Sequence, residues 1–121
     1  MEIIIDTWLY GDLAHYGSKF NQGSFANLQV TLAEGSTISD LLAKLGMPTE
    51  MRGITFINGD LSALPEVQPD LGHILKDTDR VAFFHLRSMW PYHYRHGAAT
   101  TIELSAALNT RLDKGLHHTP K

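Results

Sequence analysis

The chain has 121 residues, of which 43% are hydrophobic and 19% charged, a balance that predicts one folded domain with a single core and excludes a disordered or fibrous chain. It has no cysteine, which excludes disulfide bonds, thiolate nucleophiles and cysteine-bound zinc or iron–sulfur sites. The first residues, 1–6, contain an acidic residue at once and no long apolar run. We therefore expect a cytoplasmic protein with neither a signal peptide nor a membrane span.

Charge divides the chain into two parts. Residues 1–86 carry five Lys or Arg against eleven Asp or Glu, a balance of −6, whereas residues 87–121 carry five against two, a balance of +3. Such a basic tail could attract its own acidic body, an acidic partner or nucleic acid. Because no Lys or Arg run of the nucleic-acid type is present, we expect no nucleic-acid partner, and we expect no membrane partner either.

Two strands are predicted at the start of the chain, over residues 2–9 and 26–32. The first is rich in β-branched and aromatic residues, and both alternate between apolar and other positions. The alternating apolar positions are Ile3, Ile5 and Leu9 in the first strand and Leu28, Val30 and Leu32 in the second. Glycines interrupt residues 10–23, which are predicted to form an irregular connection.

A short amphipathic helix follows. Thr37 and Asp40 form a capping-box variant that opens it, and Gly46 is well placed as its C-terminal cap. Its apolar stripe has helical spacing and consists of Ile38, Leu41, Leu42 and Leu45.

Three further strands are predicted in the rest of the body. Residues 53–57 form an apolar run, and Asn58-Gly59 directly after it is a strong hairpin signal, so residues 61–64 return as a weak strand. Residues 71–75 are predicted to form one helical turn, and residues 80–86 close the body as a strand. The expected core consists of Leu28, Val30, Ile38, Leu41, Leu42, Leu45, Ile54, Phe56, Val81 and Phe83. A helix laid across one face of a small mixed sheet buries all these stripes, which predicts an α+β fold.

The tail is predicted to contain a helix of its own over residues 101–114. Thr100 and Glu103 form a second capping box, and Gly115 is placed to end the helix. The expected buried face consists of Leu104, Ala107, Leu108 and Leu112. Because a short amphipathic helix is marginal by itself, it needs a surface, either on the acidic body or on another chain such as a second copy.

Three segments occur in order along the body: residues 30–42 read VTLAEGSTISDLL, residues 56–59 read FING, and residues 75–84 read LKDTDRVAFF. Together they resemble the MoaD/ThiS family, the sulfur carriers of molybdopterin and thiamine synthesis. The resemblance covers about residues 1–86 and implies a β-grasp (ubiquitin-like) domain there, with residues 87–121 as a C-terminal extension. It also implies an adenylating enzyme or a cofactor-synthesis enzyme as partner, and no catalytic site or bound cofactor of the chain's own.

The tail departs from the pattern of this family. Typical members end in Gly-Gly, whose slim backbone enters the channel of an activating enzyme that adenylates the terminal carboxylate before a sulfur donor makes the thiocarboxylate. This chain has no Gly-Gly in its tail and ends at Lys121. If it carries sulfur, the expected carrier terminus is Gly97 after removal of residues 98–121. The alternative is a noncatalytic interaction or accessory subunit that retains the fold without carrying sulfur.

The most unusual segment is residues 89–95, in which three aromatic residues are crowded beside Arg and His. Its candidate partner-binding residues are Trp90, Tyr92, Tyr94 and Arg95. The same rings could instead cover the exposed face of the domain's own sheet.

Signals for catalysis or metal binding are few. His93 and His96 are candidate metal ligands, but no carboxylate or thiolate is placed to complete a site, so we expect no metal. The chain has no nucleophile elbow, no phosphate-binding loop and no locally spaced His–Asp pair. We therefore expect a carrier or binding protein, and a small metal-binding or hydrolytic enzyme is the third alternative.

Overall fold

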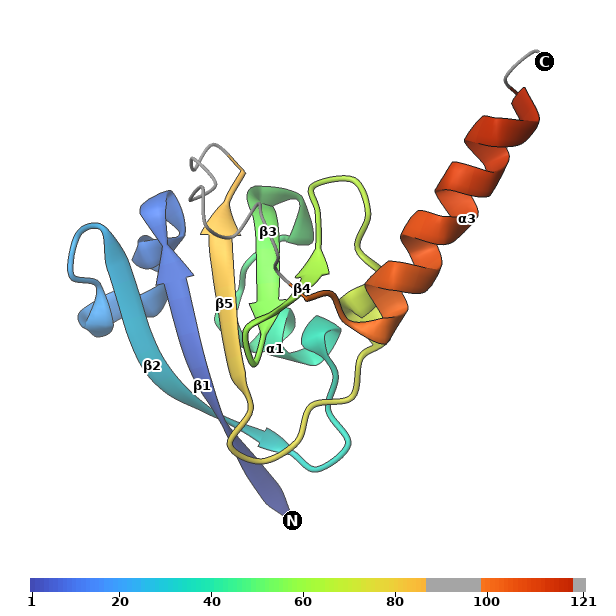
Figure 1. Ribbon diagram of the computed structural model, residues 1–121. Coiled ribbons are helices and arrows are strands. Elements are labelled where there is room, and N and C mark those ends of the chain that lie inside the picture. The colour runs from blue at the N-terminus through green and yellow to red at the C-terminus, as the bar shows by residue number, and fades with distance from the viewer. Residues whose placement is uncertain (87–98, 119–121) are drawn as a thin grey trace.

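A computed structural model of the chain describes residues 1–86 and 99–118, with residues 111–118 as backbone only (Figure 1). The fold is α+β, with one five-stranded mixed sheet and helices. In chain order the elements are β1 (Glu2–Tyr10), the 3-10 helix η1 (Gly11–Phe20), β2 (Phe25–Ala33), α1 (Ile38–Leu45), the 3-10 turn η2 (Thr49–Met51), β3 (Arg52–Ile57), β4 (Asp60–Ala63), the 3-10 turn η3 (Pro69–Gly72), β5 (Arg80–His85) and α3 (Ile102–His118).

The strands lie in the order β2-β1-β5-β3-β4. β1 pairs antiparallel with β2 and parallel with β5, while β3 pairs antiparallel with both β5 and β4. The chain therefore returns to the middle of the sheet with its last strand, and α1 crosses one face between β2 and β3 (Figure 1). This arrangement is compatible with a β-grasp-like fold.

Local signals in the sequence explain several of these elements. The capping box at the start of α1 is present, with reciprocal bonds between Thr37 and Asp40, and Gly46 closes the helix with a φ of 70°. Asn58 and Gly59 both have positive φ angles, which the tight turn between β3 and β4 requires. The predicted helix and hairpin are thus confirmed at their ends.

Apolar side chains form two clusters, one on each side of the sheet. The larger cluster joins α1 and η1 to the sheet, and the smaller one consists of Ile54, Phe56, Leu61 and Leu104. Of the ten expected core residues, eight are buried, and Leu28 and Leu45 are partly buried at the edge of the larger cluster. The expected core is therefore confirmed, except that two of its members, Ile54 and Phe56, face the opposite side from α1.

The helical segments differ from the prediction in three places. The expected turn at residues 71–75 lies earlier, as η3, because Pro69 suits the first position of a helical turn. The tail helix begins after Thr101, whose Oγ1 accepts from the amide of Leu104 at 3.3 Å, so Thr101 and not Thr100 caps it. It also runs past Gly115 to His118, since a single glycine costs a helix only about 1 kcal/mol. No helix in the described ranges is long and apolar enough to span a membrane.

Candidate functional site

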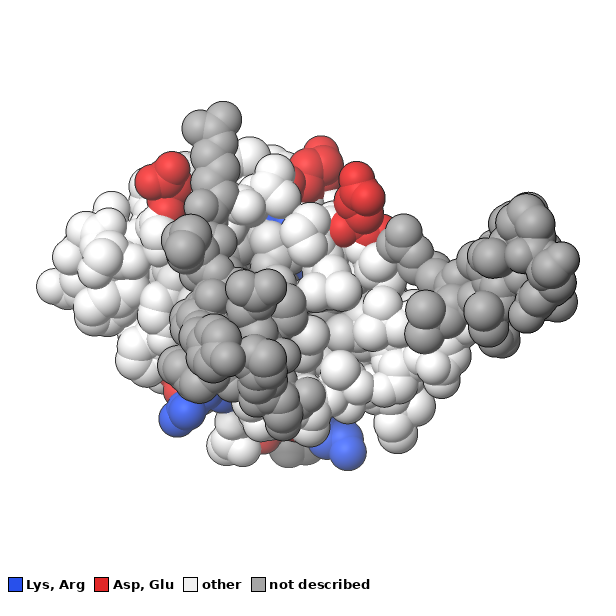
Figure 2. Space-filling model, turned by 45° about the horizontal axis from the view of Figure 1, so that its top comes forward, with Lys and Arg blue, Asp and Glu red and all other residues white. Residues whose placement is uncertain are grey.

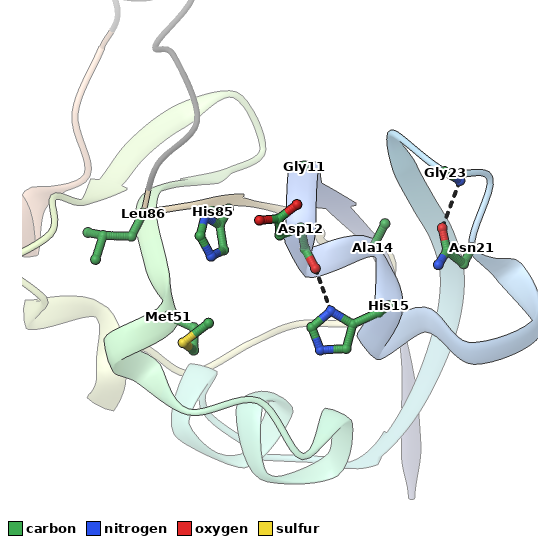
Figure 3. A pocket seen from close by; sticks show the side chains of 9 residues that line it. All are labelled: Gly11, Asp12, Ala14, His15, Asn21, Gly23, Met51, His85 and Leu86. Atoms are coloured by element: carbon green, nitrogen blue, oxygen red, sulfur yellow. Dashed lines mark hydrogen bonds between the residues drawn. The ribbon is translucent and has the colours of Figure 1, made fainter.

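A groove of about 600 Å³ lies where the two parallel strands β1 and β5 both end (Figure 3). η1 and the loop before β2 form one wall, and Met51 and the residues that end β5 form the other. The amide of Leu86, which follows β5, donates to the backbone oxygen of Met51 at 3.0 Å. The chain that continues beyond the body therefore starts at this groove.

Three titratable side chains line the groove: Asp12, His15 and His85. His15 donates from Nδ1 to the backbone oxygen of Asp12 at 2.5 Å, and His85 is 8% exposed. No group of three or more possible metal ligands occurs within residues 1–86 and the described part of the tail. Polar groups in this lining include the Asp12 carboxylate and the His15 imidazole. Seen from this end, the charged side chains lie near the margins and most of the described surface is uncharged (Figure 2).

Five aromatic rings form a row across the sheet face opposite α1. The aromatic row consists of Phe25, Trp8, Tyr10, Phe84 and Phe56, which come from four neighbouring strands. Successive ring centroids lie 5.9, 6.1, 4.6 and 5.9 Å apart. Ring contacts at these distances stabilise the packing on this side of the sheet, where Phe56 is buried in the smaller apolar cluster.

A polar cluster centred on Asp6 adjoins the aromatic row. The Asp6 carboxylate accepts hydrogen bonds from Asn27 at 2.8 Å, from Gln29 at 3.2 Å and from the Trp8 indole at 3.3 Å, and it pairs with Arg80 at 3.3 Å. Burial disfavours the charged carboxylate, but the hydrogen bonds from Asn27, Trp8 and Arg80 outweigh this effect and lower the pKa of Asp6. The ionised Asp6 therefore holds the Trp8 ring in place.

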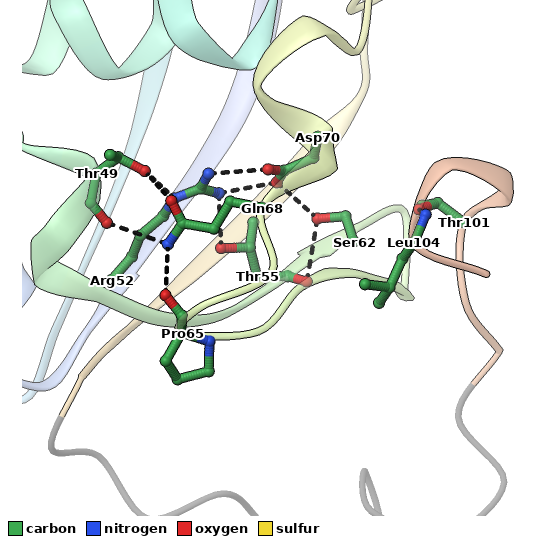
Figure 4. A network of polar contacts seen from close by, with 9 residues as sticks. All are labelled: Thr49, Arg52, Thr55, Ser62, Pro65, Gln68, Asp70, Thr101 and Leu104. Atoms are coloured by element: carbon green, nitrogen blue, oxygen red, sulfur yellow. Dashed lines mark hydrogen bonds and ion pairs between the residues drawn. The ribbon is translucent and has the colours of Figure 1, made fainter. Parts of the chain in front are cut away.

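A buried ion pair lies between β3 and η3 (Figure 4). The side chains of Arg52 and Asp70 are 0% and 1% exposed, and two guanidinium nitrogens meet the two carboxylate oxygens at 2.8 Å each. Arg52 also donates to Thr49 and Thr55, and Ser62 donates to Asp70. Because both charges are fully compensated, the network ties η3 firmly to the sheet without offering a free group to a ligand.

The start of the tail helix is anchored to the outer edge of the sheet. The amide of Leu61 in β4 donates to the oxygen of Ala99 at 2.8 Å, and the amide of Thr101 donates to the oxygen of Leu61 at 2.9 Å. Leu104 is completely buried in the smaller apolar cluster, and Leu108 packs against it. Farther along, α3 projects away from the sheet (Figure 1).

A polar contact reinforces this anchor. Glu103 in the first turn of α3 lies 2.8 Å from Nδ1 of His73, which follows η3. The hydrogen bond from His73 lowers the pKa of Glu103 below its usual value. In this contact the acidic side chain belongs to the tail and its histidine partner to the body, although the tail as a whole is basic and the body acidic.

The candidate site residues predicted from the sequence lie outside the described residues. They are the partner-binding candidates Trp90, Tyr92, Tyr94 and Arg95, the carrier terminus Gly97, and the metal-ligand candidates His93 and His96. These assignments stay predictions. The aromatic row was missed by sequence reasoning, although its signal was present: Trp8 and Tyr10 alternate with the apolar positions Ile3, Ile5 and Leu9 of the same strand.

No protein-family model, no curated protein and no solved structure matches this chain.

Proposed function

We propose that this chain is a sulfur-carrier-like β-grasp protein, which partner enzymes of cofactor or sulfur metabolism recognise and which has no catalytic site of its own. One observation supports this proposal above the others: β5 is the last strand of the body, lies in the middle of the sheet beside the parallel β1, and ends at an open groove. A carrier needs this arrangement, because the segment after its last strand must leave the rigid body and enter another protein.

The placement of the three family-like segments supports the same proposal. Residues 30–42 form the end of β2, a turn and the start of α1. Residues 56–59 form the end of β3 and the turn to β4, and residues 75–84 form the turn before β5 and most of β5. All three segments therefore lie in strands of the sheet, in the turns beside them or at the start of α1, which supports the resemblance on which the proposal rests.

In the carrier reaction, the free carboxylate of Gly97 would attack the α-phosphate of ATP and release pyrophosphate. A sulfide-level sulfur donor would then attack the carbonyl carbon of the acyl adenylate, displace AMP and leave a thiocarboxylate, with no change of oxidation state. The test uses a chain that ends at Gly97 beside the full-length chain, each incubated with ATP, a sulfur donor and a cognate activating enzyme, with masses read by mass spectrometry. Thiocarboxylate on the short form alone supports the processed carrier. If neither form gains adenylate or sulfur, the carrier proposal fails.

The second candidate is a noncatalytic interaction or accessory subunit. The observation that favours it is the anchored tail, because Leu104 is completely buried and the Glu103–His73 contact adds to it. A segment that is only removed during processing has no need of such an anchor. Retention of residues 98–121 in the native protein, with a partner lost when Leu104 is replaced by Asp, would favour this second candidate.

A further inference from the structure

β2 is an open edge strand of the sheet. It has nine residues and contains no charged residue and no proline. Among the described residues, β1 is the one strand that pairs with it, and the loop before it covers only its start, through a bridge between Asn21 and Ala26. Natural proteins usually protect such edges with lysines, prolines, bulges or a covering segment, because the free backbone groups can pair with another strand. The opposite edge, β4, has such a cover in the backbone bonds of Leu61 to Ala99 and Thr101.

The outward-pointing backbone groups of β2 follow from the pairing of β1. Ile4 and Asp6 of β1 bond toward β5, since Thr78 donates to the oxygen of Ile4 and Asp6 donates to the oxygen of Asp79, both at 2.9 Å. The alternate residues of β1 therefore bond toward β2, to Leu28, Val30 and Leu32. The backbone N–H and C=O groups of the alternating residues Asn27, Gln29 and Thr31 therefore point away from β1, toward the open side of the edge strand. Within the described part of the chain, no backbone hydrogen bond reaches these three residues from outside the sheet.

A groove of about 580 Å³ runs beside this edge, between β2, η1 and α1. Its apolar lining includes Leu28 and Leu45, which are partly buried, and Phe20, which is 43% exposed. Two cations, Lys19 and Lys44, also line it, and no carboxylate does. The groove thus combines an apolar floor with positive charge.

This positive charge stands out on an acidic body. Residues 1–86 contain only five Lys or Arg, and two of these, Arg52 and Arg80, are held in ion pairs. Two of the remaining three meet at this one groove. A ligand with apolar and carboxylate groups would match the groove, whereas a basic ligand would not.

We propose that the β2 edge binds an extended peptide segment of a partner protein, which adds a sixth strand to the sheet. The segment has apolar side chains at alternate positions, which face the groove, and carboxylates at its ends, which meet Lys19 and Lys44. A second copy of the chain fits less well, because pairing two β2 strands antiparallel would bring both lysine pairs to one seam. This proposal goes beyond the proposed carrier function and does not require that the chain carry sulfur.

The test titrates the full-length, isotope-labelled chain with a capped peptide of alternating valine and threonine that has two aspartates at each end. The backbone amides of Asn27, Gln29 and Thr31 should show the largest NMR shifts. Methylating the peptide nitrogens that face β2 should abolish binding, whereas methylating the alternate nitrogens should leave it unchanged. This pair of peptides separates strand addition from simple side-chain contact without altering the protein.

Protein variants test the two parts of the site separately. Thr31→Pro removes an outward amide and should abolish binding, while Thr31→Val keeps the amide and should bind like the natural chain. Lys44→Glu should weaken binding of the acidic peptide about fivefold and should strengthen binding of a matched peptide that has lysines at its ends. The control Lys76→Glu, which lies outside the groove, should change neither affinity.

Three results would overturn the proposal: no binding of the acidic peptide, shifts centred on another surface such as the aromatic row, or equal binding of the two methylated peptides. A dimer in light scattering that Thr31→Pro dissolves would identify a second copy as the occupant instead. Because none of these measurements involves ATP or sulfur, their failure is distinguishable from failure of the carrier function.

Discussion

Replacing Asp70 by Asn tests whether the buried ion pair holds the sheet and η3 together. The change keeps the shape of the side chain but leaves the guanidinium of Arg52, which is 0% exposed, without its counter-charge. Two hydrogen bonds of 2.8 Å weaken at once, and the remaining partners, Thr49 and Thr55, carry no charge. Removing one partner of a buried pair typically costs about 3 to 5 kcal/mol. This is a large share of the roughly 5 to 15 kcal/mol that stabilises an ordinary domain.

The assay is urea unfolding of Asp70→Asn beside the natural chain, with the slope of each transition compared to confirm that both unfold in the same way. A matched control replaces both partners, Arg52→Met with Asp70→Leu, and it should be less destabilised than the single variant because no buried charge is left alone. If Asp70→Asn unfolds within about 1 kcal/mol of the natural chain, Arg52 has access to another partner or to water, and the reasoning is wrong.

Three further predictions concern the core and the tail. Leu42→Ala should cost about 2 to 5 kcal/mol in a denaturant titration, since Leu42 is 4% exposed beneath the sheet, and a change near zero would contradict the packing of α1. Truncation after Leu86 should lower the melting temperature, because it uncovers the cluster that Leu104 closes; an unchanged melting temperature and oligomeric state would make the tail an independent appendage. Glu103→Gln should cost below about 1 kcal/mol, because the Glu103 side chain is 40% exposed. The pKa of Glu103 is lowered in the folded state, so the stability that its charge contributes is complete above the usual value of 4.5 and is lost as the pH falls through the lowered pKa. The free energies of unfolding of the natural chain and of Glu103→Gln should therefore become equal in acid. If the difference in free energy of unfolding between these two proteins grows as the pH falls, the expected direction is wrong.

Local signals predicted most of the body. The helix α1 was predictable because its cap residues Thr37, Asp40 and Gly46 act on backbone groups within one turn, and the β3–β4 hairpin was predictable because Asn58 and Gly59 both tolerate positive φ. Alternation in β2 predicted which side of that strand is buried. Such signals need no knowledge of distant contacts.

Contacts between residues far apart in the chain could not be predicted from the sequence. Arg52 and Asp70 are eighteen positions apart, and only the path of β4 and η3 brings them together. The observed cap of α3 is Thr101 and not the predicted Thr100, because the chain pairs with Leu61 just before the helix begins. A local sequence pattern cannot predict that pairing. Trp8 and Tyr10 were visible in the alternation of β1, but their stacking with Phe25 and Phe84 depends on the order of the strands.

The most direct test of the carrier function is the intact mass of the protein isolated from its native host. We expect a population that ends at Gly97 and carries sulfur in place of one oxygen of the terminal carboxylate. A chain that is intact to Lys121 under all growth conditions and contains no added sulfur would contradict it.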